Sequence, residues 1–145
     1  MSKVWNPQGL EQLDEKLAKL DTVACHNLMF NAIKVGAGVL KRNTQLSLTT
    51  KMGFKANKKL RGRNVSLVDG VKMKHDNTLC ESKVSITGFS RWFEVGTDIR
   101  KTNKGYNRGQ ITGLNFFFAA RQSSDGEINS AIASSIEKQL NRIMK

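Results

Sequence analysis

The sequence has few of the residues that build catalytic or covalently stabilised sites. Its 145 residues include one proline, two cysteines and two histidines. Cys25 and His26 are neighbours, and adjacent side chains on a helix point about 100° apart, which does not suit a shared metal ion. A site that joins either of them with His75 or Cys80 stays open, although packing and solvent contact explain these residues more simply. A nucleophile elbow, a carboxylate pair and a dinucleotide-binding glycine fingerprint are also missing. The sequence therefore predicts no enzyme, no cofactor and no metal site.

Long apolar runs are absent as well. The longest apolar run without glycine covers residues 116–120, only five residues, whereas a membrane span needs roughly 20. Residues 1–7 contain no apolar stretch of the kind found in secretory signals. We therefore expect no membrane contact, and reduced cysteines in a chain made in a cytoplasm. Length and composition favour a single domain, residues 1–145, with a modest core.

Acidic residues are missing from two long stretches of a strongly basic chain. Lysine and arginine total 24 against 12 acidic residues, which gives a net charge of +12. Residues 22–68 hold nine basic residues and no acid, and residues 99–124 hold five and no acid. Such stretches call for an anionic partner, and DNA and an acidic protein surface both fit; a merely solvated loop is the third reading. The candidate partner-binding residues are Lys51, Lys55, Lys58, Lys59, Arg61, Arg63, Arg100, Lys101, Lys104 and Arg108.

Apolar spacing predicts helices in the first third of the chain. Leucines three or four residues apart over residues 10–20 predict a short amphipathic helix. A second pattern, from residue 23 to about residue 48, predicts a longer helix that fades in the threonine-rich stretch 44–50. Gly36 and Gly38 each cost a lone helix about 1 kcal/mol, so their presence indicates close packing against another backbone or a kink.

A final helix is predicted near the end of the sequence. Ser124-x-x-Glu127 has the spacing of a capping box and should open it. Four apolar residues then follow at steps of four: Ile128, Ile132, Ile136 and Leu140. We expect Ile132 and Ile136 to pack on a sheet.

Alternating apolar residues between the helices predict a small antiparallel sheet of three to four strands. Val65 and Leu67 precede Asp69-Gly70, a dipeptide typical of hairpin turns. A strand should follow this turn, and another should cover residues 79–87. The predicted fold class is α+β, with this sheet packed against the long helix of the N-terminal half and against the C-terminal amphipathic helix.

Two segments read as loops that carry function. Residues 51–63 are polar and basic, and we expect an exposed basic arm. Residues 96–113 contain four glycines among polar and basic residues, and we expect a long mobile glycine-rich loop.

The aromatic residues exceed what one helix face can bury. Phe116, Phe117 and Phe118 are consecutive, so on a helix they span about 200°, and in a strand they face both sides. At least one should meet an additional surface, unless the domain covers all of them itself. We expect Phe116 and Phe117 to cluster with Trp92 and Phe93 near a subunit contact.

The order of these elements, with two short motifs, resembles the tail-completion or neck proteins of long-tailed bacteriophages. Members typically carry an aromatic-Val-Glu-Phe-Gly-Thr stretch, which residues 93–97 (Phe-Glu-Val-Gly-Thr) match closely. They then carry a Pro-Phe-Leu-Arg-Pro-Ala stretch, which residues 117–121 (Phe-Phe-Ala-Ala-Arg) match loosely, since both prolines are absent. The family's Pro-Val-Asp-Thr-Gly-x-Leu stretch is replaced by Thr-Thr-Lys-Met-Gly at residues 49–53, and residues 54–63 look inserted.

The resemblance implies a structural virion protein without a catalytic site. It implies a homo-oligomeric ring, a hexamer by family habit, in the phage neck between the capsid connector and the tail tube, assembled in the host cytoplasm. Connector and tail proteins would be its neighbours, with possible contact to packaged DNA. The alternative function is a small basic non-specific DNA-binding protein. The candidate assembly interface is formed by Trp92, Phe93, Glu94, Gly96, Thr97, Phe116, Phe117 and Phe118.

Overall fold

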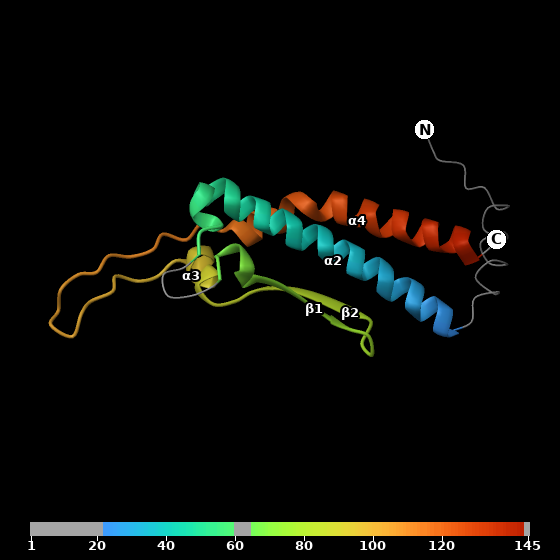
Figure 1. Cartoon of the computed structure of the whole chain (residues 1–145), viewed down its shortest axis with the longest axis horizontal. Helices are drawn as coiled ribbons and strands as arrows, with labels where there is room; N and C mark the ends of the chain where they lie inside the picture. Colours follow the sequence, from blue (N-terminus) through green and yellow to red (C-terminus); the bar gives the residue numbers. More distant parts are fainter. Residues whose placement is uncertain (1–21, 60–64, 144–145) are drawn as a thin grey trace, which may run out of the picture.

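Two long helices that run in opposite directions form the body of the protein (Figure 1). In the computed structural model, which describes residues 22–59 and 65–143, α2 spans Thr22–Met52 and α4 spans Phe116–Ile143. The two helices predicted at these places are confirmed, although both begin or end outside the predicted bounds. The helix predicted over residues 10–20 lies outside the described residues.

We predicted that the helix would fade in the threonine-rich stretch 44–50, but α2 continues through it. The hydroxyl groups of these threonines are hydrogen-bonded within the helix. The hydroxyls of Thr44, Thr49 and Thr50 each donate to the carbonyl oxygen four residues earlier, at 2.8 to 2.9 Å. Bonds of this kind leave the helical backbone continuous, although they slightly weaken and bend a helix. The helix ends at Met52, and a short 3-10 helix, η1 (Gly53–Ala56), follows.

The predicted capping box is wrong, because α4 begins at Phe116, upstream of Ser124. Ser124 is fully buried inside the helix, and its Oγ accepts a hydrogen bond from Asn43 Nδ2 at 3.0 Å. The Glu127 carboxylate accepts a second bond from Asn43 at 2.6 Å and pairs with Arg42. The serine and the glutamate share one face because they are three residues apart, and that face binds α2.

Close packing at one glycine joins the two long helices. A Cβ atom at Gly36 would lie 2.8 Å from the Ile132 side chain, whereas at Gly38 it would meet nothing within 4 Å. Gly36 is therefore closely packed, but against the side chains of Ile132 and Ile128 and not, as we predicted, against another backbone. The prediction that Ile132 packs on the sheet is wrong, since its side chain contacts α2. Ile136, one turn further along α4, is only half-buried.

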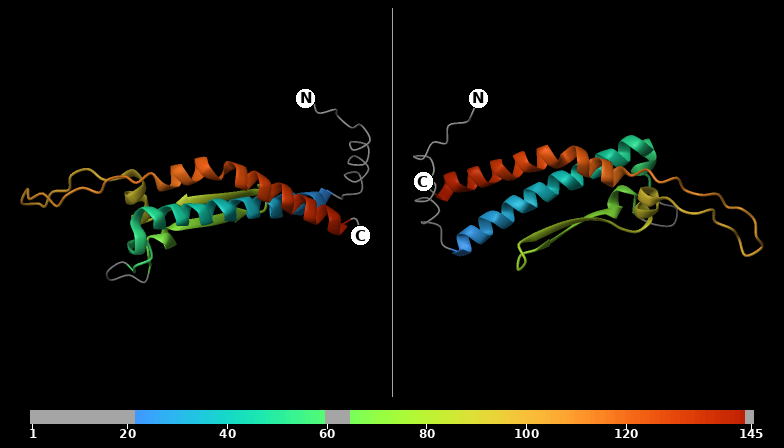
Figure 2. Two further views of the ribbon diagram at one scale, coloured as in Figure 1. Left: turned by 90° about the horizontal axis from the view of Figure 1, so that it is seen from above. Right: turned by 180° about the vertical axis from the view of Figure 1, so that it is seen from behind.

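The sheet has two strands in the part of the chain that the structure describes, not three or four. Strand β1 (Val71–Asp76) pairs with β2 (Glu81–Ile86) in antiparallel register, from Val71 opposite Ile86 to Asp76 opposite Glu81. The β1–β2 hairpin lies along α2 (Figure 2). Its turn is closed by the Asp76 carboxylate, which accepts the backbone N–H groups of Thr78 and Leu79 at 3.0 and 3.1 Å.

The predicted Asp69-Gly70 hairpin turn is also wrong. These residues lie in a second 3-10 helix, η2 (Val68–Gly70), directly before β1. The Asp69 carboxylate accepts the backbone N–H of Ser66 at 2.6 Å and its hydroxyl at 2.9 Å. These bonds fold residues 66–70 onto themselves, so they make a local turn in place of a strand.

The main core lies at one end of the molecule. Short helix α3 (Phe89–Val95) meets the C-terminal end of α2 and the first turn of α4 there. The buried apolar side chains of this core come from five separate elements or connections: Leu48, Ala56, Leu67, Val71 and Phe116. Half-buried apolar residues surround them, including Phe93 and Phe117. We call this region the junction.

Residues 96–113 leave the junction as a narrow extension that points away from the body (Figures 1 and 2). We predicted a long mobile glycine-rich loop here, and its two segments are joined by backbone hydrogen bonds. The N–H groups of Thr97, Arg100 and Thr102 donate to carbonyl oxygens of the returning segment at 2.8 to 3.1 Å. Isolated β-bridges join Gly96 with Thr112 and Lys101 with Asn107. We call this element the glycine-rich hairpin.

One described helix, Thr22–Ala56, is long and apolar enough to cross a membrane by length and composition. The sequence-based exclusion of a span considered uninterrupted apolar runs alone, and it is too strong. This helix is weak evidence for a membrane, because core helices of water-soluble proteins pass the same test. Here α2 packs along α4 and along the β1–β2 hairpin.

Candidate assembly interface

Residues 93–97, the first segment that resembles a neck-protein motif, pair at the junction with the residues that precede the second. The Leu114 N–H donates to the Phe93 carbonyl oxygen at 2.7 Å, and the Asn115 N–H donates to that of Glu94 at 3.2 Å. Residues 93–97 therefore pair with residues 111–115, which lead directly into α4. The sequence alone gives no sign of this pairing, because the glycine-rich hairpin separates the two segments.

Two glycines make this pairing tight. Gly96 has a φ of +87°, and a Cβ there would lie 2.8 Å from the Gly113 nitrogen. A Cβ at Gly113 would lie 2.7 Å from the Val95 carbonyl oxygen. Both conflicts involve backbone atoms, which cannot move aside as a side chain can. Gly96 and its neighbour Thr97, which we predicted at an assembly interface, thus hold two segments of the same subunit together at the junction.

Glu94 caps α4 from a different helix. Its two carboxylate oxygens accept the backbone N–H groups of Phe117 and Phe118 at 2.9 and 3.2 Å. The first N–H groups of a helix have no partner within it, and a negative charge is favourable at that end. Glu94 therefore fixes the direction in which α4 leaves the junction, a role within the subunit that the predicted interface did not include.

The phenylalanine run divides between the core and the surface. Phe116 is fully buried and belongs to the core, so its placement in the predicted interface is wrong. Phe117 is half-buried against that core, as is Phe93. Phe118 is 57% exposed and Trp92 is 46% exposed. These last two are the predicted aromatic residues that retain a surface for a partner.

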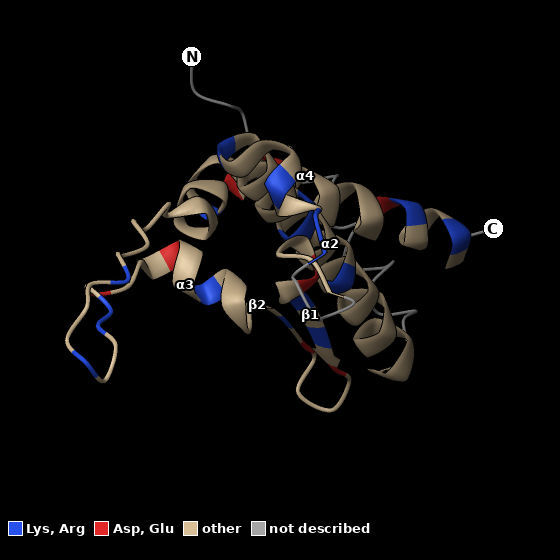
Figure 3. Ribbon diagram, turned by 60° about the vertical axis from the view of Figure 1, so that its left-hand side comes forward, with Lys and Arg blue, Asp and Glu red and all other residues tan. Residues whose placement is uncertain are grey.

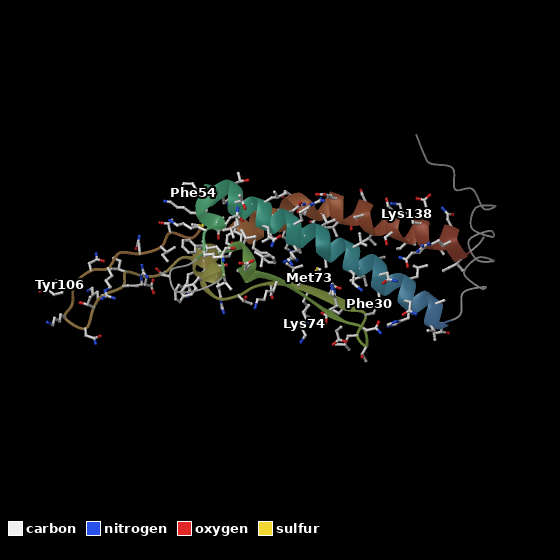
Figure 4. The ribbon with its side chains drawn as sticks, viewed as in Figure 1. Phe30, Phe54, Met73, Lys74, Tyr106 and Lys138 are labelled. Carbon is white, nitrogen blue, oxygen red and sulfur yellow. The ribbon has the colours of Figure 1, made fainter. Side chains whose placement is uncertain are left out.

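Three further apolar side chains that the predicted interface did not contain are exposed in the elements that meet at or leave the junction. Phe54 follows α2 and is 77% exposed, Val95 ends α3 and is 74% exposed, and Ile99 lies near the start of the glycine-rich hairpin. Figure 4 shows Phe54 at the junction end of the molecule. Its isolation among basic residues was a usable signal, because a lone aromatic in a polar segment has no local core to join.

The predicted basic arm is not one continuous loop. Lys51 is the penultimate residue of α2 and Lys55 lies in η1, because the helical backbone continues further than predicted. Both line a shallow groove whose apolar walls include Met52, Phe93 and Ile111. The Lys51 ammonium group donates to the Leu114 carbonyl oxygen.

The remaining basic residues of this segment separate into two groups. Lys58 and Lys59 are exposed, and the charge of Lys59 helps to lower the pKa of Asp69. Arg61 and Arg63 lie outside the described residues.

The second basic group stays together on the glycine-rich hairpin (Figure 3). Arg100, Lys101, Lys104 and Arg108 are all exposed. Across the described ranges 22–59 and 65–143, the ion pairs are Arg42 with Glu127 and Lys83 with Glu81, so none involves this group. Its charges are therefore available to an external anion.

The cysteines and histidines do not form a reactive cluster in the described part of the chain. Cys25 and Cys80 are free thiols, and no group of three or more His, Cys, Asp or Glu side chains there could hold a metal ion. The Phe30 ring stacks on His26 at 6.5 Å and meets His75 edge-on at 6.3 Å between ring centres. These contacts join α2 to the β1–β2 hairpin.

No family model, curated protein or solved structure matches the chain.

Proposed function

We propose that the protein is a structural subunit of a bacteriophage neck, in which copies form a homo-oligomeric ring between the capsid connector and the tail tube. The observation that carries the proposal is the exposure of Trp92 and Phe118 at the junction. Trp92 directly precedes the first segment that resembles neck proteins, and Phe118 lies in the second. The Glu94 carboxylate joins the two segments through the backbone N–H groups of Phe117 and Phe118, so both exposed aromatic residues belong to elements that meet at the junction.

The energetics of exposed aromatic residues support this assembly role. Burying one large apolar side chain is worth about 1.5–3 kcal/mol. In protein interfaces, aromatic residues near the centre commonly contribute most of the binding energy. A ring needs two different, complementary surfaces on each subunit. The exposed aromatic residues of the junction supply apolar area for one of these contacts, and the exposed side chains of Phe54 and Val95 add to the apolar area of the same end.

The test is Phe118→Ala, with Leu79→Ala as the matched control. Leu79 is 68% exposed but lies in the turn of the β1–β2 hairpin. Both variants should keep the circular dichroism spectrum and melting temperature of the wild type. Only Phe118→Ala should lose ring particles in negative-stain microscopy and fail to complement head–tail joining. Normal rings and joining in Phe118→Ala would contradict the proposal.

A small DNA-binding protein is the second candidate, and the unpaired basic group on the glycine-rich hairpin favours it. The two functions differ in particle shape. A wild-type chain that stays monomeric at high concentration, yet binds duplex DNA with steep salt dependence, would favour the second candidate. Ring particles in the absence of DNA would favour the neck subunit.

A further inference from the structure

The glycine-rich hairpin differs in chemistry from the junction to which it is attached. Four basic side chains lie within residues 100–108, and this stretch contains no carboxylate. The other side chains of the stretch are Thr102, Asn103, Tyr106 and Asn107, and a single glycine completes it. A surface of this composition offers hydrogen-bond donors and positive charge, and almost no apolar area.

The end of the hairpin has a defined shape. The Thr102 N–H donates to the Tyr106 carbonyl oxygen at 2.9 Å, and the Gly105 N–H donates back to Thr102 at 2.8 Å. The Tyr106 N–H also donates to the Thr102 hydroxyl at 3.0 Å. A hollow at this end is lined by side chains from both segments of the hairpin, including Lys101, Lys104 and Arg108. Backbone bonds thus place three of the four basic residues, Lys101, Lys104 and Arg108, around one concavity.

This chemistry fits a nucleic-acid backbone better than a protein surface. The centre of a protein interface is apolar and depleted of lysine, although arginine and tyrosine are common there. The end of the hairpin carries two lysines beside its two arginines and has no aliphatic side chain. The one aromatic residue at this end, Tyr106, is 70% exposed and stands among polar neighbours. Protein–DNA interfaces are polar, strongly positive and rich in contacts from Lys, Arg, Thr, Asn and Tyr to phosphate oxygens.

We propose that the glycine-rich hairpin binds duplex DNA, with Arg100, Lys101, Lys104 and Arg108 on the phosphates. The major groove, about 12 Å wide, admits a two-stranded ribbon. The hairpin projects clear of the helices, so it can reach a duplex without a clash from the body (Figure 1). Binding of this kind is independent of base sequence, because phosphate contacts carry none.

The test compares two quadruple variants with equal loss of charge. The first is R100Q/K101Q/K104Q/R108Q on the hairpin. The control is K72Q/K74Q/K138Q/R142Q, which changes exposed residues of the body; Figure 4 shows Lys74 and Lys138 there, far from Tyr106. A mixed-sequence duplex of 30 base pairs is titrated by fluorescence anisotropy at 50 and 200 mM salt.

Loss of four phosphate contacts should flatten the salt dependence of duplex binding. Each contact contributes about 0.9 to the slope of log K against log salt, so the wild type should lose about 100-fold more affinity over this range than the hairpin variant. The control should keep the wild-type slope. Equal slopes for the two variants would overturn the proposal. A hairpin-dependent preference for a poly-glutamate peptide over the duplex would overturn it as well, in favour of an acidic protein partner.

The test of DNA binding by the hairpin can fail or succeed independently of the test of ring assembly. Binding is measured on the subunit, and both variants are checked by circular dichroism and by ring formation. A hairpin variant that forms rings but no longer binds DNA supports both proposals. A wild-type chain that binds DNA through the hairpin and never forms rings removes the assembly proposal and keeps this one.

Discussion

The junction and the glycine-rich hairpin are adjacent, yet they are stabilised differently: mainly by side chains at the junction and mainly by backbone hydrogen bonds along the hairpin. At the junction, side chains make the stabilising contacts. Phe116 is fully buried, the Ser90 hydroxyl donates to the Leu67 carbonyl oxygen, and the Glu94 carboxylate caps α4. Along the hairpin, backbone groups bond mainly to each other, a few N–H groups donate to the side chains of Thr97, Thr102 and Asn107, and most side chains are exposed. Changes of side chain should therefore alter the fold at the junction, and surface chemistry alone on the hairpin.

Phe116→Ala gives the largest effect that this comparison predicts. Removing a fully buried phenylalanine should lower the free energy of unfolding by about 3–5 kcal/mol. Tyr106→Ala on the hairpin, where the ring is 70% exposed, should change it by less than about 0.5 kcal/mol. Urea unfolding followed by circular dichroism measures both. Similar losses in the two variants would mean that the hairpin contributes to the core, and the comparison would fail.

A pair of glycines sharpens the comparison at the level of the backbone. Gly96 and Gly109 both have positive φ, +87° and +76°, but a Cβ at Gly109 would meet nothing within 4 Å. Alanine at either position is disfavoured by the positive φ, at a local cost of about 1–3 kcal/mol. Gly96→Ala should lower the free energy of unfolding by about 1–3 kcal/mol more than this, because the new methyl group meets backbone atoms of the returning segment.

The measurement is the difference in melting temperature between the two alanine variants. Gly109→Ala should stay close to the wild type, because the hairpin can rearrange locally without unfolding the body. A Gly96→Ala variant as stable as Gly109→Ala would show that the paired segments are free to separate.

The smallest predicted effect concerns pH. The Ser66 backbone N–H, then the Ser66 hydroxyl, lower the pKa of Asp69 below its usual range, and the charge of Lys59 adds to this. A carboxyl group with a lowered pKa in the folded state stabilises the fold above its unfolded-state pKa, and this contribution is lost as pH falls through the folded-state pKa. The loss of stability is therefore expected at pH values below about 4.

NMR titration of the Asp69 side chain checks this directly. Its midpoint should lie below that of an unstructured aspartate. Ser66→Ala should move the midpoint upward but only in part, since the backbone N–H remains. An unchanged midpoint in Ser66→Ala would show that the hydroxyl bond does not stabilise the carboxylate.

The sequence predicted the elements with long apolar periodicity and missed those set by contacts between distant segments. Both described long helices and the close packing at Gly36 followed from spacing. The start of α4 did not, because Ser124 and Glu127 have the local pattern of a cap while their partners lie on α2. The sheet was overestimated because Val65 and Leu67 alternate like a strand, whereas residues 66–70 close a local turn through Asp69 directly before β1.

The candidate site was predicted in part for the same reason. The surplus of aromatic residues was visible in the phenylalanine run, but which member faces outward depends on where α4 begins. Phe116 is buried because it starts the helix against Leu48 and Val71, and Phe118 is then turned outward. The basic stretch 100–108 was identified, whereas its backbone pairing was not, since glycine and asparagine fit both a paired and an unpaired segment.

The position of α4 in the sequence has a consequence for the order of synthesis. It covers α2, the most apolar long helix described, yet the ribosome makes it only after the β1–β2 hairpin, α3 and the glycine-rich hairpin. Until then the nascent chain carries the α2 face around Gly36 without its cover, a state in which growing chains meet chaperones or aggregate. A stop codon just before Phe116 would make that transient state permanent, so such truncations should be cleared by proteolysis even though they retain the hairpins.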